Sequence, residues 1–243
     1  MKNKLYNDLF YENQVLGSID SAKIVLPKML EVLPKINSAV DFGCGLGAWL
    51  SVLNKLGVNE IKGYDGPWIN KDRLLIPKES FTEIEFDREF DVDKRYDLAI
   101  SVEVAEHILP KFAERFIETL CKASDIILFS AAIPLQGGTE HINEQWPEYW
   151  VNIFEKNDYV VMDFLRSQIW NEKSVEYWYK QNILVFIKKS ISEKIKIVGY
   201  SKLPLSLVHP QCYLKTRDFN RISLRQLYKL TIKRTLRKIF RKV

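Results

Sequence analysis

Val40-Asp-Phe-Gly-Cys-Gly-Leu-Gly-Ala-Trp-Leu50 predicts a buried strand, a glycine-rich turn and the start of a helix. Gly43, Gly45 and Gly47 can adopt positive φ, and without side chains they let a ligand approach the main chain closely. The stretch from Ala48 to Leu56 then has helical spacing and is followed by another glycine, which is typical of a helix C-cap. A glycine pattern alone is a weak indication, because many α/β proteins turn tightly on glycine and bind nothing there.

A carboxylate follows the glycines at a spacing typical of nucleoside sites. Ile61-Lys-Gly-Tyr-Asp65 reads as a second strand that ends in an acid about 20 residues beyond the turn. An acidic side chain there can accept hydrogen bonds from both hydroxyls of a ribose. The turn and the acid together predict a nucleoside-binding crevice more strongly than either does alone.

These two features resemble the class I S-adenosylmethionine (SAM) dependent methyltransferases, whose first motif is similar to Asp41-Phe-Gly-Cys-Gly-Leu-Gly47 and whose second strand ends in an acid like Asp65. The resemblance implies SAM as cofactor and a Rossmann-like α/β fold, a doubly wound and mostly parallel seven-stranded sheet with an antiparallel seventh strand. A dinucleotide site fits less well, because it usually has Gly-x-Gly-x-x-Gly facing a pyrophosphate. Asp41 suits a cationic amino-acid ligand and would repel a phosphate.

Length and composition leave room for one such domain. The 243 residues are 47% hydrophobic, which is enough for a sizeable core. We expect the methyltransferase domain over residues 1–207, with an N-terminal lid and helices over 1–37, and a C-terminal extension over 208–243. No stretch has the apolar length of a signal peptide or of a membrane span, which needs about 18 residues, so a cytoplasmic protein is expected.

Strands and helices are expected to alternate along the first 207 residues. After the second strand, further strands are expected over residues 81–87, 96–102, 125–131, 158–164 and 181–188. Helices are expected over residues 21–32, 110–123 and 146–156. Such alternation is typical of a parallel, doubly wound sheet with helices on both faces.

Polar residues stand where the strands end, and ligands of open parallel sheets lie outside those ends. Asp87 closes the expected third strand; in similar enzymes an acid there binds the adenine amino group, although a loop-capping aspartate is the alternative. Phe10-Tyr11 and Gly17–Ala22 resemble a lid over the methionine part of SAM, and helix capping by Ser18 or Asp20 is the alternative. The expected cofactor-binding set is Tyr11, Ser18, Asp41, Gly43, Gly45, Asp65, Asp87, Ser101 and Glu103.

The segment after the fourth strand, Ser101-Val-Glu-Val-Ala-Glu-His107, concentrates metal-binding side chains. If a helix begins here, Glu103, Glu106 and His107 project from one face. Two carboxylates and an imidazole favour Mg²⁺ or Mn²⁺, with Fe²⁺, Co²⁺ or Zn²⁺ as alternatives. Glu-x-x-Glu-His resembles the metal-binding element of plant small-RNA 2′-O-methyltransferases and ubiquinone-pathway O-methyltransferases, in which a downstream histidine can complete the site. His141, in a loop after the fifth strand, is the candidate.

The same residues have a metal-free interpretation. Many metal-free methyltransferases have a similar Glu-His pair, whose histidine caps a helix or supports the pocket. His141 would then be a general base for an acceptor hydroxyl, since imidazole titrates near neutral pH. In both cases we expect Glu106, His107 and His141 to be catalytic.

Three further segments, His141–Trp150, Arg166-Ser-Gln-Ile-Trp170 and Trp178-Tyr-Lys-Gln-Asn182, resemble bacterial methyltransferases encoded among surface-polysaccharide genes. The resemblance implies O-methylation of a sugar or a related small polar acceptor in capsule biosynthesis. The tryptophans could stack on a sugar or simply belong to the core. Arg166 could pair with an acidic group of the acceptor or form a surface ion pair.

The C-terminal extension carries the positive charge of the chain. Residues 208–243 contain eleven Lys or Arg and one acid, so their net charge is +10, against −5 for residues 1–207. As a helix from Ser223, the tail would separate apolar from basic side chains. We expect residues 215–243 to contact an anionic membrane at its inner face, an acidic partner or nucleic acid, or to pack on their own domain.

Two other functions remain open. The metal-like motif and the basic tail suggest an RNA 2′-O-methyltransferase. Against it, the catalytic part is net acidic and is a poor surface for a polyanion, so nucleic acid is not the expected partner. A noncatalytic SAM-fold module that docks through its tail is the second alternative.

Overall fold

The computed structural model describes residues 8–88, 92–195 and 204–217, together with Tyr228 and Ile232; for residues 8–14 the backbone alone is described. The chain divides into two compact units, Met1–His209 and Pro210–Val243. In the second unit, the described residues include the helix α8 (Pro210–Arg217). The basic helix expected from Ser223 lies outside the described residues, apart from its two isolated positions.

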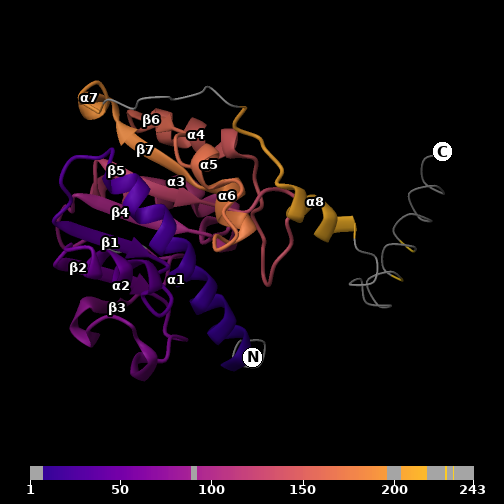
Figure 1. Cartoon of the computed structure of the whole chain (residues 1–243), viewed down its shortest axis with the longest axis horizontal. Helices are drawn as coiled ribbons and strands as arrows, with labels where there is room; N and C mark the ends of the chain where they lie inside the picture. Colours follow the sequence, from indigo (N-terminus) through magenta and orange to yellow (C-terminus); the bar gives the residue numbers. More distant parts are fainter. Residues whose placement is uncertain (1–7, 89–91, 196–203, 218–227, 229–231, 233–243) are drawn as a thin grey trace. The chain divides into compact units, whose positions relative to one another are not determined.

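A seven-stranded sheet forms the centre of the first unit, in the order β3-β2-β1-β4-β5-β7-β6 (Figure 1). The strands are β1 (Ser38–Phe42), β2 (Glu60–Asp65), β3 (Phe81–Glu83), β4 (Leu98–Val102), β5 (Ile126–Ser130), β6 (Tyr159–Met162) and β7 (Leu184–Lys188). The first five strands pair in parallel, whereas β7 is antiparallel to both of its neighbours, β5 and β6. The predicted doubly wound, mostly parallel sheet is confirmed.

Helices cover both faces of this sheet, so the core has two layers. The first layer joins the sheet to α1 (Asp8–Leu30), α2 (Ala48–Lys55), α5 (Arg166–Ile169) and α6 (Tyr177–Asn182). The second joins it to α3 (Ala113–Ala123) and α4 (Pro147–Lys156). Consecutive strand residues contribute to opposite layers, as in β1, where Ala39 belongs to the first and Val40 to the second.

Several helix and strand ends differ from expectation, including those of β3, α1 and β7. The strand expected over 81–87 ends at Glu83, because its pairing partner β2 ends at Asp65. The helix expected over 21–32 is the second half of α1, which begins at Asp8. The strand expected over 181–188 begins at Leu184, because the two preceding polar residues, Gln181 and Asn182, end α6.

The carboxyl ends of β1, β2, β4 and β5 meet at one edge of the sheet, because these strands are parallel. From β1 the chain continues to β2 on one side, and from β4 to β5 on the other. The strand order therefore reverses between β1 and β4, the place where open α/β sheets bind ligands. The glycine turn follows β1 and Glu103 follows β4, so both border this place.

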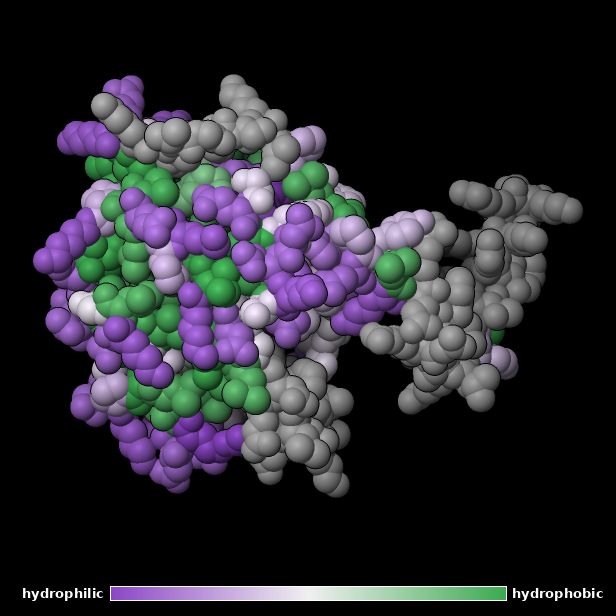
Figure 2. Space-filling model, viewed as in Figure 1, coloured by the Kyte–Doolittle hydropathy of each residue, from purple (hydrophilic) through white to green (hydrophobic). Residues whose placement is uncertain are grey.

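The face of the first unit seen in Figure 2 carries hydrophobic and hydrophilic residues in small interspersed groups. Among the described residues, no helix combines the length and the apolar character needed to cross a bilayer.

Candidate active site

The turn after β1 has the backbone that its sequence predicts, because each of its three glycines is in the left-handed region. Gly43, Gly45 and Gly47 have φ values of +83°, +55° and +85°, which side chains rarely adopt. A Cβ at Gly43 would clash with the methyl groups of Val104, whereas a Cβ at Gly45 would meet nothing within 4 Å. The main chain at Gly45 therefore faces open space, and a ligand can approach it.

Asp65 joins the end of β2 to this turn. One carboxylate oxygen accepts a hydrogen bond from the Gly45 N–H at 2.7 Å, and the other accepts one from the Gly66 N–H at 2.6 Å. Burial raises the pKa of Asp65, while these hydrogen bonds and one from Trp68 oppose the rise. The two features that predicted a nucleoside crevice therefore form a single site.

Asp41 and Ser101 lie in the sheet beside the crevice, and each has a side-chain oxygen without a partner. The Asp41 side chain is buried, and among the described residues its Oδ1 has no hydrogen-bond partner. Burial, and then the nearby charge of Asp65, raise the pKa of Asp41 well above its usual range. The Oγ of Ser101 is likewise buried and unpartnered within the described structure. Such atoms are expected where a bound ligand completes the hydrogen bonding.

Glu103 begins the loop after β4 in a strained conformation. Its φ is +56°, and its main-chain N–H donates to the carbonyl of Ser130 at the end of β5. Its carboxylate accepts from the side-chain amides of Gln136 at 2.9 Å and Asn182 at 3.0 Å. Strain of this kind is concentrated at functional sites, where the surrounding contacts maintain it.

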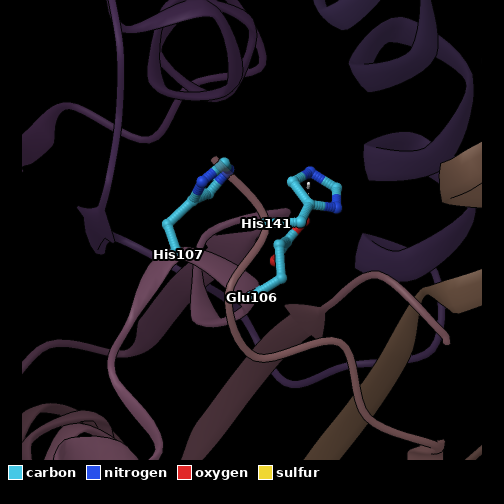
Figure 3. A group of neighbouring side chains, drawn as sticks. All are labelled: Glu106, His107 and His141. Atoms are coloured by element: carbon cyan, nitrogen blue, oxygen red, sulfur yellow. Dashed lines mark ion pairs between the residues drawn. The ribbon is translucent and has the colours of Figure 1, made fainter. Parts of the chain in front are cut away.

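Glu106, His107 and His141 converge beside this position (Figure 3). Each offers one ligand atom, and these atoms lie within 4.8 Å of one another. Glu106 is fully buried, and neither of its carboxylate oxygens has a hydrogen-bond partner in the described structure. Burial, and then the charge of Glu103, raise the pKa of Glu106 well above its usual range. The arrangement can hold a divalent cation, which would neutralise this carboxylate.

The two histidines reach the cluster from different strands. His107 ends the 3₁₀ turn Ala105–His107 after β4, and its ring lies edge to face with that of His141, 4.9 Å between centroids. His141 Nε2 lies 3.9 Å from a Glu106 oxygen, and its Nδ1 lies 3.1 Å from Glu144 Oε1. Burial and the neighbouring His141 lower the pKa of His107. The ring of His107 is therefore suited to the neutral form that binds metals.

Hydrogen bonds hold the loop that carries His141 against the segments that follow β4 and β5. The main-chain N–H groups of Ile142 and Asn143 donate to the carbonyl of Glu106, at 3.0 and 2.9 Å. The Glu144 carboxylate accepts from the N–H groups of residues 135 and 137 and also contacts His141. These hydrogen bonds hold His141 beside Glu106.

Some expected site residues lie elsewhere or differ in geometry. Glu103 is not part of the metal-type cluster, because a 3₁₀ turn replaces the expected helix and its carboxylate faces the two amides. Asp87 is exposed and lies beyond the end of β3. Ser18 lies within α1, too far from the helix start to cap it, and its hydroxyl contacts that of Tyr179 at 3.0 Å. The side chain of Tyr11 is outside the described part of the chain.

The two proposed acceptor contacts are also revised. Arg166 is neither a surface residue nor free for an acceptor, because it is fully buried and doubly hydrogen-bonded to Asp163. Trp150 is buried in the core, so it is not available as a sugar platform. Trp178 is partly buried and packs against the first core layer. Trp146 remains 42% exposed at the start of α4.

Sequence reasoning missed the amides that surround Glu103. Gln136 lies after β5, and Gln181 and Asn182 end α6, yet all three are buried and hydrogen-bonded to one another. Consecutive amides at the start of an apolar strand were a usable signal, because buried amides require partners.

The site is strongly acidic. Asp41, Asp65, Glu103 and Glu106 are all enclosed, and within the described residues none of them is paired with a lysine or an arginine. Buried carboxylates require a counter-charge or hydrogen-bond donors. The four carboxylates therefore make this end of the Rossmann-like sheet suited to a cationic ligand.

Comparison with known proteins identifies the class. A family model described as a methyltransferase domain matches residues 20–171, which is more than half of the chain. The chain belongs to this methyltransferase domain family and is an enzyme. A search of curated proteins gave no significant match.

Solved methyltransferase structures share the fold. The methyltransferase domain of bacterial CtHen1-C is 19% identical with a TM-score of 0.52, over 70% of this chain and 98% of that one. Magnesium protoporphyrin IX methyltransferase from Synechocystis PCC 6803, crystallised with SAM, is 17% identical with a TM-score of 0.54, over 77% and 89%. The sugar N-methyltransferase KedS8 from Streptoalloteichus sp. ATCC 53650 is 11% identical with a TM-score of 0.57, over 76% and 96%.

Proposed function

We propose that this enzyme is a SAM-dependent O-methyltransferase that acts on a hydroxyl of a sugar or a related small polar acceptor, as in surface-polysaccharide (capsule) biosynthesis. The observation that carries the proposal is the buried Glu106 carboxylate, which has no hydrogen-bond partner in the described structure and lies next to His107 and His141. A carboxylate and two imidazoles at the mouth of a methyltransferase crevice are suited to activating an oxygen nucleophile.

The residues of the crevice fit SAM. Asp65 would bind the ribose, since a carboxylate has about four acceptor positions and the hydrogen bonds from Gly45, Gly66 and Trp68 occupy three of them. Asp41 and Glu103 offer buried carboxylates for the ammonium group of the methionine part. When bound, SAM supplies a methyl group already activated by a positively charged sulfur. The protein then has to align the acceptor oxygen and remove its proton.

Glu106, His107 and His141 are the residues that would hold Mn²⁺ or Mg²⁺. The donor set of one carboxylate oxygen and two imidazole nitrogens is compatible with either ion, and with Fe²⁺, Co²⁺ or Zn²⁺. A bound divalent ion lowers the pKa of a hydroxyl that coordinates it. Glu144 supports such a site, because accepting the Nδ1–H of His141 leaves the Nε2 lone pair on the side of Glu106.

The same geometry supports a metal-free reaction. With Nδ1–H donated to Glu144, His141 Nε2 can accept the proton of the acceptor hydroxyl. Glu106 would then stabilise the protonated imidazole, as a buried carboxylate does in a catalytic dyad. The two routes share His141 and differ in whether an ion is required.

The charge distribution of the chain indicates which acceptor and which partners this enzyme would have. A net charge of −5 over residues 1–207 disfavours a nucleic acid acceptor and is compatible with a small sugar-derived molecule. Residues 215–243 would bind an acidic partner or the inner face of a membrane, and the enzyme would otherwise be cytoplasmic.

A methyl-transfer screen tests the proposal. The full chain is incubated with SAM and, separately, with nucleotide sugars, free sugars and a short RNA, and methylated products are read by mass spectrometry. The expected result is methylation of a sugar hydroxyl that stops on chelation and returns with Mn²⁺ or Mg²⁺. Activity that persists in the chelator would leave the metal-free route. Exclusive methylation of RNA, or no binding of S-adenosylhomocysteine (SAH), would overturn the proposal.

A further inference from the structure

Three buried amide side chains form a hydrogen-bonded chain that ends on Glu103. Gln136, Gln181 and Asn182 are 5%, 0% and 3% exposed, so these bonds are made without competition from solvent. Gln181 Nε2 donates to Gln136 Oε1 and to Asn182 Oδ1, each at 2.9 Å. Gln136 Nε2 and Asn182 Nδ2 then donate to the two oxygens of Glu103, at 2.9 and 3.0 Å. Both oxygens of this carboxylate are thereby held.

The orientation of every amide follows from one main-chain group. The N–H of His209 lies 2.9 Å from the oxygen of the Gln181 side chain, and a main-chain N–H can only donate. Gln181 must therefore turn its NH₂ group toward Gln136 and Asn182, and these two must receive it with their oxygens. Their own NH₂ groups are left for Glu103. If any one of these amides were flipped, an NH₂ group would face another donor, or an oxygen would face another oxygen, and a hydrogen bond would be lost.

The segment that contains His209 is held in place by hydrogen bonds to the rest of the first unit. Arg166 donates to the carbonyl of Leu205 at 2.8 Å and to that of Gln181 at 3.1 Å, and its buried pair with Asp163 fixes its direction. His209 Nε2 also lies 3.1 Å from a main-chain carbonyl, that of residue 170. Contacts at both ends of the segment 204–209 therefore fix the position of the His209 N–H that orients the amides.

Two donors aimed at Glu103 fix the direction of its carboxylate. Burial raises the pKa of Glu103, and the hydrogen bonds from Asn182 and Gln136 oppose this rise. With a φ of +56° and an N–H bonded to Ser130, the backbone of Glu103 is fixed as well. Within the described chain no lysine or arginine pairs with Glu103, and His141 is its nearby electrostatic partner, so a cationic ligand can supply further counter-charge.

We propose that Gln136, Gln181 and Asn182 are positioning residues that aim the Glu103 carboxylate at the ammonium group of the bound cofactor. They act through Glu103 and do not touch the cofactor themselves. The segment 204–209 sets the orientation of the three amides, because the His209 N–H donates to the side-chain oxygen of Gln181. This inference rests on the proposed use of SAM. It adds that the amides, acting through Glu103, increase the affinity for the amino-acid part of SAM.

The test compares two ligands that differ by one ammonium group. Binding of SAH and of its deaminated analogue is measured by calorimetry for the wild type, Asn182→Asp, Gln136→Glu and Gln181→Met. The first two changes replace a donor to Glu103 by an acceptor of the same size. We expect SAH affinity to fall about 10-fold or more in both, with little change for the deaminated analogue. Gln181→Met should show the same selectivity with a smaller loss.

Controls separate positioning from folding. Gln168→Glu makes the same amide-to-carboxylate change on the exposed side of α5 and should leave both affinities unchanged. Thermal unfolding of each variant shows whether it is folded, and Asn182→Ser offers a milder change if Asn182→Asp is not. Equal loss of both ligands in folded variants, or no loss of SAH affinity, would overturn the inference. A wild type that binds neither ligand would instead contradict the proposed function.

Discussion

The carboxylate of Asp65 accepts a hydrogen bond from the main-chain N–H of Gly45 at 2.7 Å. This bond connects the end of β2 to the turn after β1, two segments that are 20 residues apart. The acid therefore supports the turn in addition to its proposed role as the acceptor for a ribose. Its second hydrogen bond, from Gly66, fixes the plane of the carboxylate.

Replacing Asp65 by alanine should weaken cofactor binding by both routes. The ribose loses its acceptors, and the Gly45 N–H loses its partner. Hydrogen bonds to a charged group contribute about 1.5–3 kcal/mol each, so SAH affinity should fall about 10- to 100-fold. Calorimetric titration measures this loss. Asp72→Ala, at an exposed aspartate that pairs with Lys78, should bind SAH as the wild type does; unchanged affinity in Asp65→Ala would refute the assignment.

Glu106→Gln should abolish metal binding with little change in shape. The amide offers a weaker ligand than the carboxylate and no charge to neutralise the ion. At a Mn²⁺ concentration 100 times the dissociation constant, a site specific to the folded state stabilises it by about 2.7 kcal/mol. Wild-type protein should therefore unfold several degrees higher with Mn²⁺ than without, and Glu106→Gln should show no such difference. Glu114→Gln, at an exposed pair with Lys156, should retain the full Mn²⁺ effect. Equal shifts in all three proteins would place the ion elsewhere.

Local pattern was sufficient to predict the elements that build the crevice. The strand before Gly43, the helix after Gly47 and the acid at Asp65 each follow from hydrophobic spacing and glycine placement within a short stretch. The end of β3 did not follow, since a strand ends where its partner ends and β2 ends at Asp65. Asp87 therefore lies beyond the strand that it was expected to close, and its contact with adenine stays a prediction.

The candidate site was predictable in membership more than in geometry. Glu106, His107 and His141 were expected together, and they do converge. Glu103 was expected with them because helical spacing was assumed, but its positive φ directs the chain into a 3₁₀ turn instead. The amide partner Gln136 is 45 residues from Gln181, so no local pattern could have predicted their contact.

Arg166→Met should destabilise the fold severely. Arg166 and its partner Asp163 are both buried, so the change leaves an unpaired carboxylate in the core. Losing one partner of a buried pair costs about 3–5 kcal/mol. Urea unfolding followed by circular dichroism measures the change. Arg88→Met is the matched control, because Arg88 forms an exposed pair with Glu85 at the same sequence spacing, and it should cost less than about 1 kcal/mol. A mild effect at Arg166 would show that its charge is not needed by the fold.

Stability should fall with decreasing pH because of His209. Burial, and then the nearby Lys180, hold its pKa below the usual value of 6.5, although its contact with the carbonyl of Trp170 opposes this. As the pH falls below 6.5, this histidine becomes protonated in the unfolded chain but stays neutral in the folded chain until the lower folded pKa is reached. The free energy of unfolding therefore decreases as the pH falls from the unfolded pKa toward the lower folded pKa.

The variant His209→Gln isolates this contribution. Glutamine keeps a side-chain donor for the carbonyl of Trp170 and leaves the main-chain N–H of residue 209 in place, but it does not titrate. Urea unfolding at a series of pH values between about 5 and 8 should give a shallower slope for the variant than for the wild type. His107, whose pKa is also lowered by burial, contributes equally to both proteins and cancels in the comparison. Identical slopes would mean that His209 is protonated as readily in the folded chain as in the unfolded one.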